Sequence, residues 1–241
     1  MDLNEAIGMR RSRRRFIPAR MDDDTVASLH NVVVEQGRRS KCRMEFVVNH
    51  GAAFAGLTRS YGMFTGVRHY VGLICEAGDK LAIERLGYFG EIVLLHAVGL
   101  GLGTCWVGGS FARRLCPFTL SEDERIACVI VVGPVEPDPS ARERMIRDVI
   151  HRHTKTVEQM STSDGPTPDW FATGMRAVQK APSAVHRQPV FFEYRDGVVS
   201  ASVPESNDDT YLLDLGIAKL HFEVGAGGGT WEWGNGGSFT R

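Results

Sequence analysis

The chain has 241 residues, which is enough for one large domain or two small ones. Its hydrophobic content of 43%, charged content of 24% and net charge of −1 are those of an ordinary globular protein. Proteins that bind nucleic acid non-specifically usually carry a basic surplus, because their affinity grows with the number of phosphates they neutralise. The balanced charge therefore argues against nucleic acid as a partner.

Membrane and metal partners are not expected either. No uninterrupted apolar run approaches the roughly 20 residues that a membrane-spanning helix needs. The arginine-rich N-terminus also lacks the apolar stretch of a signal peptide. None of the five cysteines forms a CxxC pair, and several lie in apolar runs. This usage predicts reduced, buried thiols in a cytoplasmic protein, without a zinc site or a disulfide framework.

In the first half, apolar patterns predict an alternation of helices and strands. Acidic residues followed by an apolar stripe predict a helix over 21–37 that ends at Gly37. A helix over 81–98 is apolar nearly all round in its second half, which indicates that it is buried. The other expected elements are a short helix at 4–11 and strands at 44–48, 69–75 and 126–133, the last of them buried on both faces.

The second half begins after a predicted linker at 161–169, which is rich in turn-forming residues. A short helix near 170 and a loop over 181–189 follow. Residues 190–203 predict a hairpin whose turn is its Asp-Gly pair. The chain then continues with a helix that has one apolar face and ends in a glycine-rich tail; the face consists of Leu213, Ile217, Leu220 and Val224.

Two stretches, one in each half of the chain, have similar sequences. LHAVGLGLGTCW (95–106) and LHFEVGAGGGTW (220–231) share Leu-His, three alternating glycines, Thr and Trp in the same order, and each follows a predicted long helix. Glycine-rich segments match easily by chance, so this similarity alone leaves both an internal duplication and a coincidence open.

The arginine segment, residues 10–16, has two interpretations. A run of charge is usually a solvated face of the protein. Here, however, Ser12 adds a hydroxyl inside the run and Phe16 closes it with an apolar anchor. Guanidinium groups bind phosphate through two parallel hydrogen bonds, and a serine hydroxyl can complete such a cradle. The segment therefore suits a single phosphate better than a polymer.

Two loops could approach a ligand. The stretch 101–109 is either a helix cap with a flexible turn or a place where glycine N–H groups approach a planar ligand. It is not the GxGxxG dinucleotide motif. The loop 181–189 offers hydrogen-bond donors between two prolines, or simply connects two elements. No GxSxG elbow or Ser-His-Asp order indicates a hydrolase, and Glu91 and His96 lack the spacing of a metal helix.

Four stretches together resemble motifs of the FMN-dependent nitroreductase superfamily. They are RRSRRRF (10–16), GYFGEIVLLHAVGLGLGTCWVGG (87–109), RERMIRDVI (142–150) and APSAVHRQP (181–189). The resemblance implies an α+β fold, with an α/β/α sandwich around a mixed, mostly antiparallel sheet, and it implies FMN as the cofactor.

The order of the motifs is unusual for this superfamily. In typical members the Pro-Ser motif, which APSAVHRQP resembles, lies shortly after the arginine motif, which RRSRRRF resembles. Two intertwined subunits share each flavin site in those members. Here the Pro-Ser motif lies in the second half of the chain. This displacement predicts two related halves fused in one chain and packed as one unit, 1–158 and an abridged 165–241. Such a pseudo-dimer would hold one flavin and would be a monomer or a weak homodimer.

The resemblance also implies cofactor-binding roles by position. The FMN phosphate would be held by Arg10 and Ser12, helped by Arg142 and Arg144. Arg11 would lie along the ribityl chain, and Arg14 near N1 and the C2 carbonyl of the ring. Gly109, with Gly108 beside it, would direct its N–H toward N5. The ring would be covered by Pro182, Ser183, Ala184 and His186, with Gln188 in the same loop. No side chain is implied as a catalytic acid or base.

The function that the resemblance implies is an oxidoreductase. Hydride would pass from NADH or NADPH through flavin N5 to a nitroaromatic, quinone-like or other electron-poor small molecule. Two departures from the motifs support an alternative: His186 stands in place of the usual Asn, and Gly108 stands where many members carry Glu. The alternative is a protein that binds or sequesters FMN with little or no reductase turnover. A scaffold that has lost flavin altogether is a third interpretation.

Overall fold

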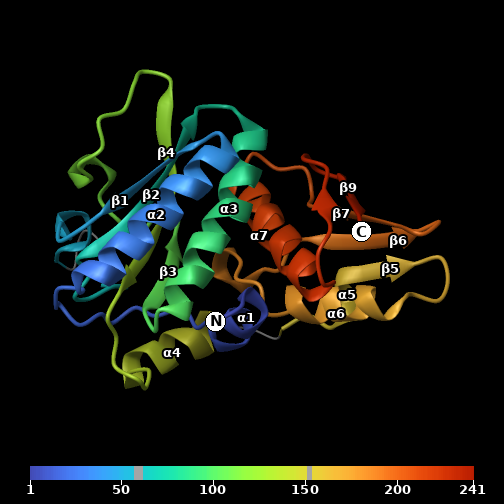
Figure 1. Cartoon of the computed structure of the whole chain (residues 1–241), viewed down its shortest axis with the longest axis horizontal. Helices are drawn as coiled ribbons and strands as arrows, with labels where there is room; N and C mark the ends of the chain where they lie inside the picture. The colour runs from blue at the N-terminus through green and yellow to red at the C-terminus, as the bar shows by residue number, and fades with distance from the viewer. Residues whose placement is uncertain (57–61, 151–153) are drawn as a thin grey trace.

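Two long helices that pack against each other form the centre of the molecule, with a β-sheet on either side of the pair (Figure 1). The computed structural model describes residues 1–56, 62–150 and 154–241. The central helices are α3 (Lys80–Gly99) and α7 (Thr210–Gly225). Most of their residues are buried, which explains why both sequences are apolar on nearly every face.

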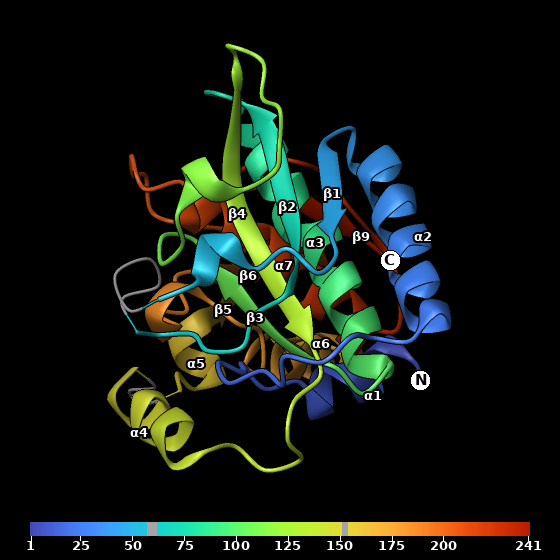
Figure 2. The ribbon, with the colours of Figure 1, turned by 90° about the vertical axis from the view of Figure 1, so that its left-hand side faces the viewer.

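Within the described residues the first sheet has four strands, all antiparallel, in the order β1-β2-β4-β3. Figure 2 shows these strands side by side; they are β1 (Arg43–Val47), β2 (His69–Glu76), β3 (Gly103–Val107) and β4 (Glu124–Gly133). Helices α2 (Asp23–Ser40) and α3 cover one face. An aromatic-rich core that includes Phe16, Phe54 and Tyr70 covers the other face.

The second sheet has the order β5-β6-β7-β9-β8 in the described part of the chain. Its strands are β5 (Ser161–Ser163), β6 (Phe191–Arg195), β7 (Val198–Ser202), β8 (Thr230–Trp231) and β9 (Ser238–Thr240). Only the β5–β6 pair is parallel. Helices α6 (Asp169–Val178) and α7 pack together beside this sheet. The predicted α+β class with mostly antiparallel pairing is therefore confirmed.

Shorter helices complete the described structure. They are α1 (Leu3–Met9), α4 (Ala141–Ile150), α5 (Val157–Met160) and the 3-10 turns η1 (Ala52–Phe54), η2 (Arg113–Leu115) and η3 (Ala184–His186). Over the ranges that the structure describes, no helix is both long and apolar enough to cross a membrane.

The two sheets repeat one order of elements. In the first half the chain runs α2-β1-β2-α3-β3-β4, and in the second half it runs α6-β6-β7-α7-β8-β9. The strand orders match as well, β1-β2-β4-β3 against β6-β7-β9-β8, with β5 added at one edge. The duplication of 1–158 in 165–241 stays a prediction, and this repeated connectivity supports it.

Several elements differ from the sequence prediction. Helix α1 ends at Met9 rather than at residue 11, so the arginine segment is not helical. Helix α2 does not end at Gly37 but continues to Ser40, because Lys41 takes the left-handed cap conformation instead, with φ 55°. The glycine-rich stretch 101–109 contains strand β3 rather than only a turn. The predicted linker at 161–169 begins with strand β5, whose hydroxyl-bearing residues gave no apolar signal.

The central helices approach closely because glycines stand where they meet. A Cβ built on Gly87 would lie 2.1 Å from the carbonyl oxygen of Leu213, and one on Gly216 would lie 1.9 Å from that of Glu84. Both distances are far below any real Cβ contact. The contact between α3 and α7 therefore requires a residue without a side chain at each of these positions.

A buried ion pair links the same two helices to the C-terminal tail. Lys219 of α7 donates to Glu84 of α3 at 2.5 Å and to the carbonyls of Glu232 and Gly234 at 2.9 and 3.0 Å. The other carboxylate oxygen of Glu84 accepts the N–H of Gly234 at 2.7 Å. Burial lowers the pKa of Lys219, while the Glu84 carboxylate opposes that effect. The glycine-rich tail is thus fixed to the helix pair by buried charges.

A second buried pair lies further along the helices. Nε2 of His221 is 2.9 Å from Oε1 of Glu91, and its Nδ1–H donates to the carbonyl of Ala177 at 3.1 Å. The remaining oxygen of Glu91 accepts the indole N–H of Trp106 at 2.7 Å. These three contacts join α3, β3, α6 and α7, so both halves share one hydrogen-bond network.

The close helix contact leads to a stability prediction. Gly216→Ala should lower the free energy of unfolding by about 2 kcal/mol or more, because the added methyl group collides with backbone atoms that cannot move aside. Gly8→Ala is the matched control: a Cβ there meets nothing within 4 Å, and alanine favours helix α1. Urea denaturation measures both; equal stability of the two variants would contradict the proposed role of Gly216.

Candidate functional site

A cavity of about 510 Å³ lies between the first sheet and the loop 181–189. Its walls come from distant parts of the chain: the arginine segment, the end of β3 with residues 108–110, the loop, and helix α7. Small-ligand sites in proteins have volumes of about 300–1,000 Å³, so this cavity is large enough for a mononucleotide.

The arginine segment lies alongside strand β3 in an extended conformation. Ser12 forms a parallel bridge with Thr104, and the N–H of Arg13 donates to the carbonyl of Thr104 at 2.8 Å. Successive side chains of an extended chain point to opposite sides. Accordingly Arg10, Ser12 and Arg14 line the cavity, whereas Arg13 does not.

Arg13 and Glu143 hold this segment on the side that faces away from the cavity. The carboxylate of Glu143, on α4, accepts the N–H groups of Arg14 and Arg15 at 2.7 and 3.1 Å and the Nε–H of Arg13 at 3.2 Å. Ser140 donates to it through both its N–H and its hydroxyl, at 2.8 and 2.9 Å. Burial alone would raise the pKa of Glu143, but the N–H groups of Arg14, Ser140 and Arg15 lower it to about 2.

Arg10 is a half-buried cation with a buried, unused donor. One of its terminal nitrogens donates to the hydroxyl of Ser12 at 3.3 Å, while Nε has no hydrogen-bond partner among the described residues. Burial lowers the pKa of Arg10, and Glu91 and Cys105 oppose that effect. A buried donor without a partner is uncommon in proteins, and a ligand in the cavity would supply one.

Arg14 crosses the cavity wall toward the first sheet. Its guanidinium contacts Sγ of Cys105 at 3.7 Å and lies 5.4 Å from the ring centre of Phe64. Burial raises the pKa of Cys105, which keeps its thiol protonated beside the two arginines. Gly108 and Gly109 follow at the end of β3, where an added Cβ would meet nothing within 4 Å. Packing within the protein therefore does not require glycine there, and the open space belongs to the cavity.

The loop 181–189 forms the opposite wall in a strained conformation. Val185, His186 and Gln188 have φ angles of 45°, 55° and 45°, which non-glycine residues rarely adopt. Among the contacts that hold the loop in place, Ser183 Oγ accepts the N–H of Gln188 at 2.9 Å, and the N–H of Ala184 donates to Asp214. Strain of this kind persists only where the surroundings enforce it.

His186 is partly buried at the edge of this wall. Its Nε2 lies 3.2 Å from the hydroxyl of Thr154. Burial and the nearby Arg10 lower the pKa of His186, so its imidazole is neutral at pH 7.

Nine of the residues predicted to bind the cofactor line this one cavity, although the sequence separates them widely: Arg10, Ser12, Arg14, Gly108, Gly109, Pro182, Ser183, Ala184 and His186. The structure does not bring the other four to its walls. Arg11 is exposed and donates to the carbonyl of Gly8 at 3.1 Å. Gln188 binds the N–H of Lys155 at 2.8 Å, and Arg144 donates to the carbonyl of Pro139 at 2.5 Å.

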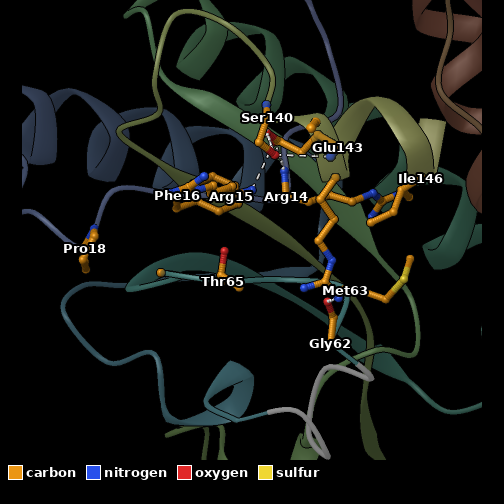
Figure 3. Close-up of a pocket in the computed structure, with 13 residues that line it drawn as sticks. Arg14, Arg15, Phe16, Pro18, Gly62, Met63, Thr65, Ser140, Glu143 and Ile146 are labelled. Atoms are coloured by element: carbon orange, nitrogen blue, oxygen red, sulfur yellow. Dashed lines mark hydrogen bonds between the residues drawn. The ribbon is translucent and has the colours of Figure 1, made fainter. Parts of the chain in front are cut away.

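The fourth, Arg142, lines a neighbouring hollow of about 600 Å³. Figure 3 shows this hollow, with Arg14 and Met63 among the residues around it. The guanidinium of Arg142 donates to the carbonyl of Gly62. Arg14 and Met63 line both this hollow and the cavity, so the two spaces adjoin.

Several cavity residues were not predicted from the sequence. They include Met63, Cys105, Trp106, Lys180, Thr210 and Asp214. One of them carried a usable signal: Asp214 is an acidic residue within an apolar helix, and an acidic group is seldom buried without a purpose. The others are residue types that occur in any core or loop, so nothing in the sequence marked them.

A cationic cavity built from distant loops is typical of a protein that binds a small anionic ligand. The described residues hold no cluster of three or more His, Cys, Asp or Glu side chains that could bind a metal ion. The family model described as "Putative TM nitroreductase" matches residues 2–226. The chain therefore belongs to the nitroreductase family, as its motifs predicted.

One solved structure agrees with this assignment at the level of the fold: a Thermotoga maritima protein described as a "putative nitroreductase" is 18% identical and covers 99% of this chain and 92% of its own, with a TM-score of 0.65. Weaker matches over part of the chain include a "putative nitroreductase in complex with FMN" of Desulfovibrio desulfuricans (18% identity, 60% of this chain, 95% of that one, TM-score 0.42) and a nitroreductase with bound FMN of Bacteroides fragilis (15%, 58%, 96%, 0.42). A search of curated proteins gave no significant match.

The contacts of Glu143 lead to a prediction about pH. A carboxyl whose pKa is lowered on folding stabilises the protein above its unfolded pKa of about 4.3 and loses that effect as the pH falls toward 2. Glu143→Gln should therefore lower the free energy of unfolding at pH 7 by on the order of 3 kcal/mol. The difference from the wild type should shrink below pH 4.

Urea denaturation at pH 7 and at pH 3 measures this difference. Glu122→Gln is the control, because Glu122 is exposed and should leave the stability unchanged at both values. A loss in Glu143→Gln that is the same at pH 7 and pH 3 would show that the carboxylate is not responsible.

Proposed function

We propose that the cavity binds FMN and that the protein is an FMN-dependent oxidoreductase. The observation that carries the proposal is Arg10, a half-buried cation whose buried Nε lacks a partner among the described residues and which lies beside the hydroxyl of Ser12. Such a pair favours an anionic ligand with phosphate geometry. Membership of the nitroreductase family favours FMN over other phosphates.

The residues present fit this cofactor. Arg10 and Ser12 would hold the phosphate, and Arg14 would place a fixed positive charge beside the isoalloxazine ring. The open space in front of Gly108 and Gly109 would accept the ring, since no Cβ fills it. The loop 181–189 would cover the other side. The predicted contacts of Arg11, Arg142, Arg144 and Gln188 with FMN remain predictions.

When bound, FMN would supply the redox chemistry, accepting hydride from NADH or NADPH and passing it to a nitroaromatic, quinone-like or other electron-poor molecule. The protein's own part is binding and orientation. Arg14 would stabilise negative charge on the cofactor, and the loop 181–189 would keep bulk water from its ring. Neutral His186 and the thiol of Cys105 add no net charge to the cavity.

The fused halves are part of the same proposal. The arginine segment and the end of β3 come from 1–158, and the loop 181–189 comes from 165–241, yet both line one cavity. A single chain would then complete a site that typically needs two subunits. It follows that the protein should act as a cytoplasmic monomer or weak homodimer.

The second candidate is a protein that binds FMN without reductase turnover. It is favoured by His186, whose ring is directed to Thr154, and by Gly108, which offers no side chain to the cavity. Both positions depart from the motifs of active nitroreductases, so either candidate accounts for the cavity.

FMN binding tests what both candidates share. Arg10→Ala should weaken FMN binding by roughly 10- to 100-fold, since a charge-assisted hydrogen bond contributes about 1.5–3 kcal/mol. Arg38→Ala removes the same charge from an exposed position on α2 and should change the affinity less than twofold. Calorimetric titration with FMN measures both. Equal affinity of the two variants would remove the phosphate role from Arg10.

Anaerobic titration of the FMN-loaded protein with NADH and NADPH separates the two candidates. We expect loss of the flavin absorption band near equimolar donor for at least one nucleotide. Subsequent addition of a nitroaromatic or a quinone should restore the band. A bound flavin that neither nucleotide reduces would instead establish the binding protein.

A further inference from the structure

Among the described residues that line the cavity, Asp214 is the only one with a carboxyl group. It lies on α7 with 3% of its surface exposed, and both of its carboxyl oxygens accept the single N–H of Ala184, at 3.1 and 3.2 Å. An isolated N–H group does not compensate a buried negative charge, which normally requires a cation or several donors. The site therefore favours the neutral acid.

The charged and titratable groups around Asp214 do not change this conclusion. They are Arg187 and Asp208 near the start of α7, Cys128 on β4, and Arg10, Cys105, Lys180 and His186 on the walls of the cavity. Arg187, the cation that opposes the effect of burial, is itself paired with Asp208 at 3.1 Å. Burial accordingly raises the pKa of Asp214 to about 8, with the Ala184 N–H and Arg187 acting in the opposite direction.

The contact with Ala184 lies at the start of the strained loop. The next two residues, Val185 and His186, have positive φ angles, so the backbone there depends on its neighbours to keep its shape. Asp214 is also packed under the loop, since it lines the small space beneath Pro182 and Ser183. One side chain of α7 thus holds the loop and contributes to the floor of the cavity.

We propose that Asp214 is a positioning residue that takes up a proton when the anionic cofactor binds: it holds the loop 181–189 over the cavity through the N–H of Ala184, and as the carboxylate, unlike the neutral acid, it repels the cofactor. This inference rests on the proposed FMN site. The proton uptake follows from linkage: if protonation of Asp214 raises the affinity for the cofactor by some factor, bound cofactor raises the proton affinity of Asp214 by the same factor.

The pH range of the effect can be stated. The phosphate of FMN is already ionised above pH 7, His186 is already neutral there, and burial keeps Cys105 and Cys128 protonated. Among the described residues that line the cavity, Asp214 is then the group that we expect to titrate between pH 7 and 9. Wild-type affinity for FMN should fall about tenfold over this range, with proton uptake on binding near pH 8.

Asp214→Asn tests the proposal, because asparagine keeps the shape and the acceptor for Ala184 but cannot ionise. We expect this variant to bind FMN with an affinity that changes less than twofold between pH 7 and 9. Calorimetry in two buffers of different ionisation enthalpy should show proton uptake for the wild type and none for the variant. Asp169→Asn, at an exposed aspartate of the same half, should behave like the wild type.

The outcomes separate the two proposals. If wild type and Asp214→Asn bind FMN with the same pH dependence and the same proton uptake, the role of Asp214 is wrong while the FMN site stands. If neither binds FMN at any pH, the proposed function falls and the inference falls with it.

The free energy of unfolding, measured without cofactor, tests the proposal even if Asp214→Asn folds poorly. An acid whose pKa is raised on folding destabilises the protein increasingly as the pH rises from about 4 to 8. Stability relative to Asp214→Asn should therefore fall over this range. A constant difference would contradict the neutral acid.

Discussion

The contact between α3 and α7 is the constraint on which the rest of the structure depends. Gly87 and Gly216 let the two backbones meet, and Lys219 and His221 then reach the carboxylates of Glu84 and Glu91. Each helix packs beside its own sheet, so this contact sets where one sheet lies relative to the other. The cavity adjoins the same contact. Trp106, which donates to Glu91, lines the cavity, and so do residues of α7.

The cavity also depends on the extended backbone of the arginine segment. Alternation of side chains places Arg10, Ser12 and Arg14 toward the ligand space and turns Arg13 toward Glu143. The five arginines of residues 10–16 therefore do not act as a cluster. Arg13 anchors the segment through Glu143, whereas Arg10 and Arg14 face the cavity.

Much of the fold could be predicted from local pattern, because α3, α7, β4 and the hairpin of β6 and β7 are long apolar runs or carry an Asp-Gly turn. The remaining elements depend on tertiary contacts. Strand β3 lies in a glycine-rich stretch that resembles a turn and becomes a strand by pairing with β4. Likewise the motifs identified nine cavity residues, whereas the pairing of Glu84 with Lys219 joins positions too distant for any local pattern to connect.

Three buried ionisable residues of the apolar helix α7, namely Asp214, Lys219 and His221, differ in whether they serve the structure or the cavity. Lys219 and His221 each face a carboxylate of α3, and their remaining hydrogen-bond donors are used by backbone carbonyls. Asp214 has no cation of its own and borders the cavity instead. A buried polar group that its neighbours pair holds the helices together, and an acidic group that they leave uncompensated is stable as the neutral acid. Helix α7 therefore binds α3 through Lys219 and His221 near its C-terminal end, and it lines the cavity with Asp214 nearer its N-terminal end.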